Sequence, residues 1–338
     1  MLHCFEGQTA DEVWCQGART VLFSPDAVQQ DSQHGTTQEV LHAVFHIKNP
    51  RNRWVLSRQP GINPAFAIAE ALWILAGRDD ARFINYWNKR YPQYAGSGDH
   101  YHGAYGRRLR HHFGQDQLER AYSTLSACSD SRQVVLSIWD ANSDFPASDG
   151  SPVARDIPCN ICSLLKVRNG RLEWTQVMRS NDLFLGTPYN FVQFTTIQEV
   201  IAGWLGLEVG NYSHFSDSLH AYELYDGVSG RFSIGERAEA IDNNDSIALP
   251  KAAFDATLAK ITKVLDAFIE VDLPRRSFAG LLDTDMPEGY RNLMLVVAAD
   301  AARRRHWAPE MQGALSQCTN PALTAAWRNW RAQYALTT

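Results

Sequence analysis

The segment from residue 162 to residue 207 constrains the fold most, because it combines two strands, a tight turn and a long apolar run. Residues 162–167 and 172–176 alternate polar and apolar side chains, as half-buried strands do. Between them lies Arg-Asn-Gly at positions 168–170, a favourable hairpin turn. Residues 191–207 are strongly apolar. The segment therefore predicts a β-hairpin followed by a buried helix.

A second helix is predicted to begin at Asn63. Asn63-Pro64 suits a helix cap and a first turn, and apolar side chains recur at helical spacing as far as Gly77. Glu70 lies on the buried face of this helix. Because an unpaired buried carboxylate is costly, Glu70 needs either a partner or a chemical role.

Weaker patterns describe the rest of the chain. Residues 39–47 and 133–139 predict strands, whereas residues 1–35 show no clear period and predict turns and short elements. Further helices are predicted at 251–271, 289–305 and 321–334. No Pro/Gly/Ser-rich linker divides the chain. We therefore expect a single domain over residues 1–338, with a divergent helical C-terminal part from about residue 230.

The composition restricts the class of protein. The chain has 338 residues, 45% hydrophobic and 20% charged, which is ordinary for a soluble globular protein. Its net charge of -5 argues against a nucleic acid polymer as partner, although a small anion remains possible. No apolar run approaches the roughly 20 residues that cross a membrane. The N-terminus resembles no secretory signal, so we expect a cytoplasmic protein.

The chemistry of the chain centres on Cys159. A thiol is a nucleophile only as thiolate, and Arg179 is a candidate cation to favour that form. Asn190 offers both a donor and an acceptor, which suits the edge of an amide-like ring. Cys162 lacks the further Cys or His ligands that zinc needs, so no metal is expected. These residues suggest covalent catalysis on a small anionic heterocycle.

These motifs resemble thymidylate synthase. That family has a Pro-Cys nucleophile, then Arg-Ser-x-Asp, Leu-Gly-x-Pro-aromatic-Asn and His-x-Tyr, and the chain carries them at 158–159, 179–182, 185–190 and 220–222. Upstream, residues 70–77 resemble the glutamate helix of the family, 103–106 its catalytic tyrosine loop, and 131–132 the segment that lends arginines to the partner subunit. The resemblance runs from about residue 60 to about residue 225.

The resemblance implies an α/β fold, with a large twisted mixed sheet, packed helices and a homodimer formed through sheet faces. It also implies transfer of a one-carbon unit from the folate 5,10-methylenetetrahydrofolate to C5 of a pyrimidine nucleoside monophosphate. Cys159 would add to C6 of the ring. Glu70 would relay protons with ordered water, and Tyr105 would assist removal of the C5 proton.

By the same resemblance, the remaining motif residues bind the two substrates. The phosphate would contact Arg179, Ser180 and, across the dimer interface, Arg132. The uracil edge would contact Asn190, and the sugar hydroxyl His220 and Tyr222. The folate would lie against Asp182, Gly186 and Trp87.

The departures from the family pattern bear on the product. Asn160 stands where the family usually has His, which alters the polar network beside the base. Gln133 replaces a second phosphate arginine, and residues 31–37 hold no clear counterpart of a mobile one. Candidate substitutes are Arg51, Arg53, Arg58 and Arg107. The family's C-terminal tail, which excludes water, is unrecognisable in residues 335–338, and this favours a hydroxymethyl product slightly over a methyl one.

Several alternatives stay open. Asn190 favours uracil, since cytosine-specific relatives tend to carry Asp there, but a CMP or dCMP hydroxymethylase is a further possibility. The sequence does not distinguish UMP from dUMP. A thymidylate synthase proper, making dTMP, is the alternative product class. A cysteine hydrolase would leave the Arg-Ser-x-Asp motif unexplained, and a non-catalytic nucleotide-binding paralogue would have no use for Cys159.

Overall fold

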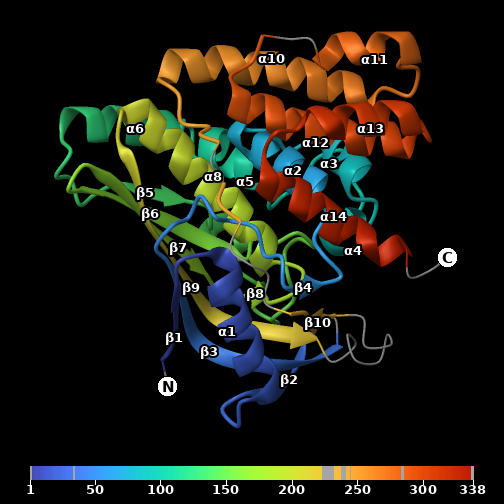
Figure 1. The fold of residues 1–338 in the computed structure, drawn as a ribbon. Coiled ribbons are helices and arrows are strands. Elements are labelled where there is room, and N and C mark those ends of the chain that lie inside the picture. The colour runs from blue at the N-terminus through green and yellow to red at the C-terminus, as the bar shows by residue number, and fades with distance from the viewer. Residues whose placement is uncertain are drawn as a thin grey trace.

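The computed structural model describes residues 2–32, 35–222, 232–236, 241–243, 245–282 and 285–335. A mixed sheet forms one side of the molecule, and helices pack on it (Figure 1). The strands run in the order β1-β3-β9-β7-β6-β5, with β2 paired to β3 and β8 to β9. Their bounds are His3–Gly7 (β1), Val28–Ser32 (β2), Gly35–Ile47 (β3), Val135–Ser137 (β5), Asn160–Arg168 (β6), Arg171–Met178 (β7), Asn181–Asp182 (β8) and Glu208–Tyr222 (β9).

The sheet is mixed, as the resemblance implied. Strand β9 runs parallel to β7 and β8 but antiparallel to β3, and β1 is parallel to β3. A separate short pair joins β4 (Arg58–Gln59) to β10 (Ser233–Ile234). Because β8 and the end of β9 lie side by side, the motifs at 179–182 and 220–222 meet at one end of the sheet.

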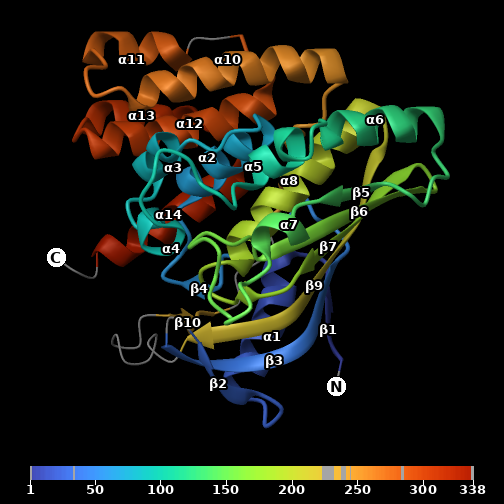
Figure 2. The same ribbon diagram turned by 180° about the vertical axis from the view of Figure 1, so that it is seen from behind.

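The helices form two layers over the sheet (Figures 1 and 2). The layer that touches the sheet contains α1 (Ala10–Phe23), α6 (Gln117–Ala127) and α8 (Thr187–Leu205), and α2 (Pro64–Leu75) packs on α8. The outer layer contains α10 (Lys251–Ile269), α11 (Arg275–Leu282), α12 (Glu288–Arg304), α13 (Ala308–Gln317) and α14 (Pro321–Ala335). Short helices between these are α3 (Ala81–Trp87), α4 (Tyr91–Ala95), α5 (Tyr105–Arg107), a π-helical turn (Arg108–His112) and α7 (Ala141–Asp144).

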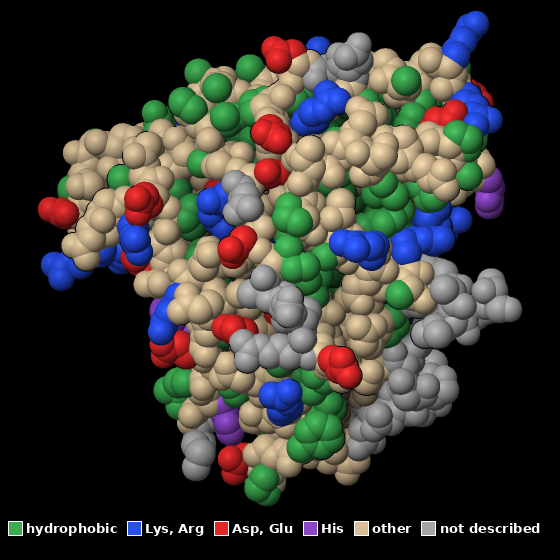
Figure 3. Space-filling model, in the orientation of Figure 1, with side chains coloured by type: hydrophobic (Ala, Val, Ile, Leu, Met, Phe, Trp, Pro, Cys, Tyr) green, Lys and Arg blue, Asp and Glu red, His purple; other side chains and the backbone are tan. Residues whose placement is uncertain are grey.

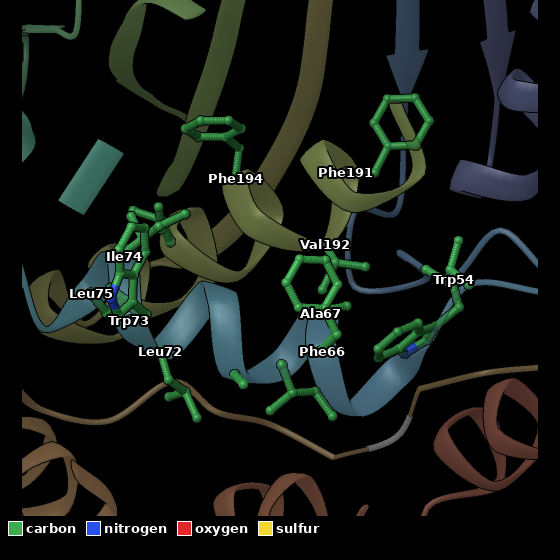
Figure 4. Packing of buried hydrophobic residues seen from close by; sticks show 14 of the residues in the cluster. Trp54, Phe66, Ala67, Leu72, Trp73, Ile74, Leu75, Phe191, Val192 and Phe194 are labelled. Carbon is green, nitrogen blue, oxygen red and sulfur yellow. The ribbon is translucent and has the colours of Figure 1, made fainter. Parts of the chain in front are cut away.

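Helix α2 lies in the middle of the molecule and explains the burial of Glu70. The Asn63 side chain accepts hydrogen bonds from the backbone N–H groups of Ala65 and Phe66, at 3.0 and 3.2 Å, so the predicted cap is confirmed. Every residue of α2 is buried, because α8 covers one side and α12 another. Figure 4 shows Phe66 of α2 beside Val192 of α8. No side chain of α2, including Glu70, therefore faces open solvent.

The predicted hairpin is confirmed. Arg168 pairs with Arg171, and the two residues between them, Asn169 and Gly170, both have positive φ, at 51° and 73°. This is the conformation that an Asn-Gly turn favours, and its twist matches the flanking strands. The predicted strand at 39–47 lies within β3, whereas the one at 133–139 is shorter, as β5.

The expectation of only turns and short elements at 1–35 was wrong. Residues 10–23 form helix α1, which begins at Thr9, whose hydroxyl accepts from the Glu12 N–H at 3.2 Å. The buried side of α1 includes Val13, Trp14, Ala18 and Val21. These positions recur at helical spacing, so the signal was present in the sequence.

The C-terminal third follows the prediction in part. Helices α10, α12 and α14 match the three predicted segments, whereas α11 and α13 were missed. Trp327 and Trp330 are buried in the core. Within the described residues, no helix is long and apolar enough to span a membrane. On the face drawn in Figure 3, acidic and basic side chains are interspersed, without one continuous basic surface. The organisation as a single domain stays a prediction.

Candidate active site

Arg179 is fixed against the segment that carries Cys159. Its Nε donates to the Pro158 carbonyl at 2.9 Å and its Nη2 to the Ile157 carbonyl at 3.2 Å. The guanidinium also lies over the ring of Trp139, at 5.3 Å from the centroid. These contacts use Nε and Nη2. Nη1 donates to none of the described residues and can meet a ligand anion.

The effect of Arg179 on the thiol differs from the expectation. Cys159 is half-buried just before β6. Burial raises the pKa of the Cys159 thiol, and the Arg179 charge lowers it without offsetting burial. The carboxylates of Asp156 and Asp182 raise it further. In the free protein, one close arginine is therefore not enough to favour the thiolate.

Glu70 has the buried position and the partner that the sequence required. It is 7% exposed, and its Oε2 accepts a hydrogen bond of 2.6 Å from Nε2 of Gln193. Burial raises the pKa of Glu70 to about 7, and the bond from Gln193 lowers it in part. A carboxyl group with a pKa near neutrality can both give and take a proton, as a relay must.

Tyr105 lies close enough to both Cys159 and Glu70 for their charges to act on it. Burial raises the pKa of Tyr105 well above its ordinary value, and the charges of Cys159, Asp156 and Glu70 act in the same direction. Its hydroxyl therefore stays protonated and can donate a hydrogen bond at neutral pH. The structure thus brings together the three residues that the resemblance placed at the reacting ring.

Asp156 is a site residue that the sequence reasoning missed. Its Oδ2 accepts from the Gly103 N–H at 2.8 Å, and burial raises its pKa. Tyr91 lies near it, since the pKa of Tyr91 is raised by burial and also by the charges of Glu70 and Asp156. The only signal for Asp156 was its position three residues before Cys159, and Tyr91 gave none.

The turn from β8 to α8 holds Asp182 in one orientation. Its Oδ1 accepts from the N–H groups of Phe184 and Leu185, at 2.8 and 2.7 Å. Gly186 closes the turn, since a Cβ there would lie 3.0 Å from Oδ1 of Asn181. A fixed carboxylate accepts the paired N–H donors of an amino-pyrimidinone ring. These residues therefore fit the pterin of a folate.

His220 and Tyr222 lie at the end of β9, beside β8. Asp182 pairs with His220 in the sheet. The rings of His220 and Tyr222 make an edge-on contact, with 5.4 Å between their centroids. Burial raises the pKa of Tyr222, and the charges of Asp182 and Cys159 contribute. Ser180 lies half-buried between Arg179 and β8. Of this downstream set, Arg179, Asp182 and Tyr222 lie within electrostatic range of Cys159.

The Asn160 side chain binds a neighbouring strand of the sheet. It is fully buried, and its side-chain oxygen accepts from Nε2 of Gln176. Oε1 of Gln176 in turn accepts from Ser163 at 2.7 Å and from Trp174 at 3.0 Å. Asn160 therefore anchors the start of β6 directly after the nucleophile, and its catalytic role stays a prediction.

The comparison with known proteins decides the family. A family model described as thymidylate synthase matches residues 19–265. The chain belongs to the thymidylate synthase family. It is a one-carbon transferase, and enzymes of this family use methylenetetrahydrofolate as the one-carbon donor. The family prediction from the motifs is thereby confirmed.

Three phage proteins are similar to this family member, and each is named deoxyuridylate hydroxymethyltransferase. The protein of Bacillus phage SP01 is 29% identical over 290 residues, covering 80% of this chain and 74% of its own. That of Pseudomonas phage M6 is 35% identical over 204 residues, covering 60% of this chain and 57% of its own. That of Delftia phage PhiW-14 is 29% identical over 206 residues. The last two matches span less than two thirds of those relatives.

Two predicted site residues of this family member have no interaction with the group around Cys159 among the described residues. Trp87 is 1% exposed and packs against Tyr86, at 4.8 Å between ring centroids, and near the Arg304 guanidinium. A folate would reach it only if these neighbours moved. Arg132 is exposed before β5, and its expected role in a neighbouring subunit stays a prediction.

The four arginines considered as phosphate substitutes are committed to other groups, so the structure gives that expectation no support. Arg53 pairs with the buried Glu199, and Arg107 with Asp79 at 2.9 Å. Arg51 donates to the Asp245 carbonyl at 2.6 Å, and Arg58 to the Phe184 carbonyl at 2.7 Å. Arg179 is therefore the arginine whose placement beside Cys159 suits a phosphate.

Proposed function

We propose that this enzyme hydroxymethylates C5 of deoxyuridylate, with methylenetetrahydrofolate as the one-carbon donor. The observation that carries the proposal is that Cys159 and Glu70 both lie within electrostatic range of Tyr105, while Arg179 is held by the backbone next to Cys159. The similarity of this chain to the deoxyuridylate hydroxymethyltransferase of Bacillus phage SP01, over 80% of its length, supports the hydroxymethyl product and the deoxyuridine nucleotide.

The roles follow from the chemistry of each group. Arg179 binds the nucleotide phosphate through its remaining nitrogen, and the bound base lies between Cys159 and Asn190. The Cys159 sulfur bonds to C6 of the ring, and the electron pair moves to C5. The thiol proton passes to solvent or a site base, and the Arg179 charge assists this loss in the complex. The folate, when bound, supplies the one-carbon unit that C5 accepts.

Tyr105 and Glu70 handle the protons of the later steps. Tyr105 assists removal of the C5 proton, and Glu70 exchanges protons with the base through water. The transferred carbon is released from the folate nitrogen as the C5 proton is lost. The oxygen of a water molecule then bonds to that carbon, its proton passes to solvent or a site base, and the Cys159 thiolate leaves C6. This sequence has no net redox change. It therefore yields tetrahydrofolate, whereas reductive methylation would yield dihydrofolate.

The enzyme is proposed to act as a homodimer through one face of the sheet. Val44, Phe215, Val177 and Cys162 form a row of partners across β3, β9, β7 and β6. These side chains are half-buried, whereas alternate residues of β3 and β9, such as Phe45, are buried against α1 and α8. An apolar row of this kind suits a second copy, whose Arg132 would then reach the phosphate.

The test is incubation with methylenetetrahydrofolate and, separately, UMP, dUMP, CMP and dCMP. Mass spectrometry reads the product, and absorbance reads dihydrofolate. We expect a hydroxymethyl product from dUMP and no dihydrofolate. A methyl product with dihydrofolate would identify a synthase, and product from the cytosine nucleotides alone would overturn the proposed base. A Cys159→Ser variant should bind dUMP without turnover.

A further inference from the structure

A line of three buried side chains connects the proton relay to the group that reads the base. Nε2 of Gln193 donates to Oε2 of Glu70 at 2.6 Å. Oε1 of Gln193 accepts from Nδ2 of Asn190 at 3.1 Å. Gln193 is 4% exposed and Asn190 is 6% exposed. Both lie on α8, three residues apart, so they share one face of the helix.

One polar atom at the Asn190 end of this line lacks a hydrogen-bond partner among the described residues. Oδ1 of Asn190 is buried and has no hydrogen-bond partner among the described residues. A buried acceptor without a partner is costly, so such an atom in a functional site points to a ligand. The ligand that meets Oδ1 must supply a donor.

The direction of each amide follows from the one before it. Above its pKa of about 7, Glu70 is a carboxylate with acceptors only, so Gln193 turns its NH₂ group towards it. Its carbonyl oxygen then faces Asn190 and requires a donor there. Asn190 must therefore turn its NH₂ group towards Gln193, which leaves its oxygen facing the ligand.

We propose that Gln193 determines base selectivity, by holding the Asn190 amide with its oxygen towards the nucleotide. The inference rests on the proposed function, and it adds a positioning residue to that site. Uracil carries an N–H donor at N3, which matches the Asn190 oxygen. Cytosine carries a lone pair at N3, which would oppose that oxygen and leave both acceptors unpaired. Without Gln193, the amide could rotate and serve either base.

The test measures binding rather than turnover. Isothermal titration calorimetry with dUMP and with dCMP gives two dissociation constants for the wild type and for Gln193→Met, which keeps the volume but neither hydrogen bond. We expect the wild type to prefer dUMP, and the preference to fall by about tenfold or more in the variant. Gln193→Ser, which leaves room for water, should show the same loss and serves if the Met variant is poorly folded.

A matched control lies on the same helix. Gln198 is also a fully buried amide of α8, but it donates to the carbonyls of Leu172 and Gly210 instead. Gln198→Met should lower the midpoint of thermal unfolding and leave the dUMP preference unchanged. Equal wild-type affinities for dUMP and dCMP, or an unchanged preference in a folded Gln193 variant, would overturn the proposal. If the wild type prefers dUMP but makes no product, the proposed function fails while the inference on selectivity stands.

Discussion

The backbone N–H of Gly103 donates to Oδ2 of Asp156 at 2.8 Å, and this bond ties the loop of Tyr105 to the segment of Cys159. The two backbones also approach closely. A Cβ on Gly103 would lie 2.8 Å from the Asp156 carbonyl oxygen. The spacing of the phenol and the thiol therefore depends on a glycine at position 103.

Gly103→Ala should separate the two segments and slow the reaction. Because the clash is with backbone, the loop itself has to shift, and misplacement of about 1 Å can cost roughly a hundredfold in kcat. Overpacking should also destabilise the fold by about 1–3 kcal/mol. Steady-state kinetics and thermal unfolding measure both effects. Gly280→Ala is the control, since a Cβ there meets no atom within 4 Å; equal behaviour of the two variants would contradict the prediction.

Glu70→Gln should abolish most of the turnover and keep nucleotide binding. Loss of a positioned acid–base group typically costs about 10²- to 10⁴-fold in rate, whereas an amide keeps an acceptor for Gln193. The quantities to compare are kcat with dUMP and the dissociation constant of dUMP. A variant that retains more than half of the wild-type kcat would remove Glu70 from the mechanism.

The same variant should change how stability depends on pH. Burial raises the pKa of Glu70 from 4.5 to about 7, so the native state holds a proton that the unfolded chain releases above about pH 4.5. The wild type therefore loses stability as pH rises from about 4.5 to about 7, by at most about 3 kcal/mol from this group. The Glu70→Gln variant does not lose this stability, because glutamine does not ionise. Urea unfolding at pH 5 and pH 7.5 should show the variant gaining stability relative to the wild type.

The elements that could be predicted are those with strong local signals. The Asn169-Gly170 turn and the Asn63 cap depend on backbone chemistry that neighbouring residues determine, and both are confirmed. Helix α1 was missed although its apolar positions recur at helical spacing, because small and polar residues separate them.

The site could be predicted only where a motif existed. Cys159, Tyr105 and Glu70 belong to family motifs, and the structure brings them together. Asp156 and Gln193 lie outside those motifs and join the site through hydrogen bonds to residues distant in sequence. The effect of burial on the Cys159 pKa also could not be predicted from the sequence, because it depends on how deeply the thiol is buried in the fold.

Arg179→Lys should weaken nucleotide binding although the charge is kept. A lysine has no planar fork, so it cannot hold the Pro158 and Ile157 carbonyls and also present a nitrogen to phosphate. We expect KM for dUMP to rise about tenfold or more, because at least one charge-assisted contact is lost. Arg171→Lys is the control, since Arg171 pairs with Glu208 on the surface at 3.2 Å. An unchanged KM in the Arg179 variant would assign the phosphate to another residue.

Mixing two inactive variants tests whether Arg132 acts in the neighbouring subunit. In a dimer that pairs Arg132→Ala with Cys159→Ser, one site combines an intact Cys159 from the first chain with an intact Arg132 from the second. Random pairing makes half of the dimers mixed, with one intact site each, so mixing should restore about a quarter of the wild-type activity. Arg179→Ala mixed with Cys159→Ser is the control. Arg179 bonds to the segment of its own Cys159, so that mixture should stay inactive. Absence of recovery in the first mixture, in dimers verified by mass spectrometry, would place the action of Arg132 within its own chain or outside the site.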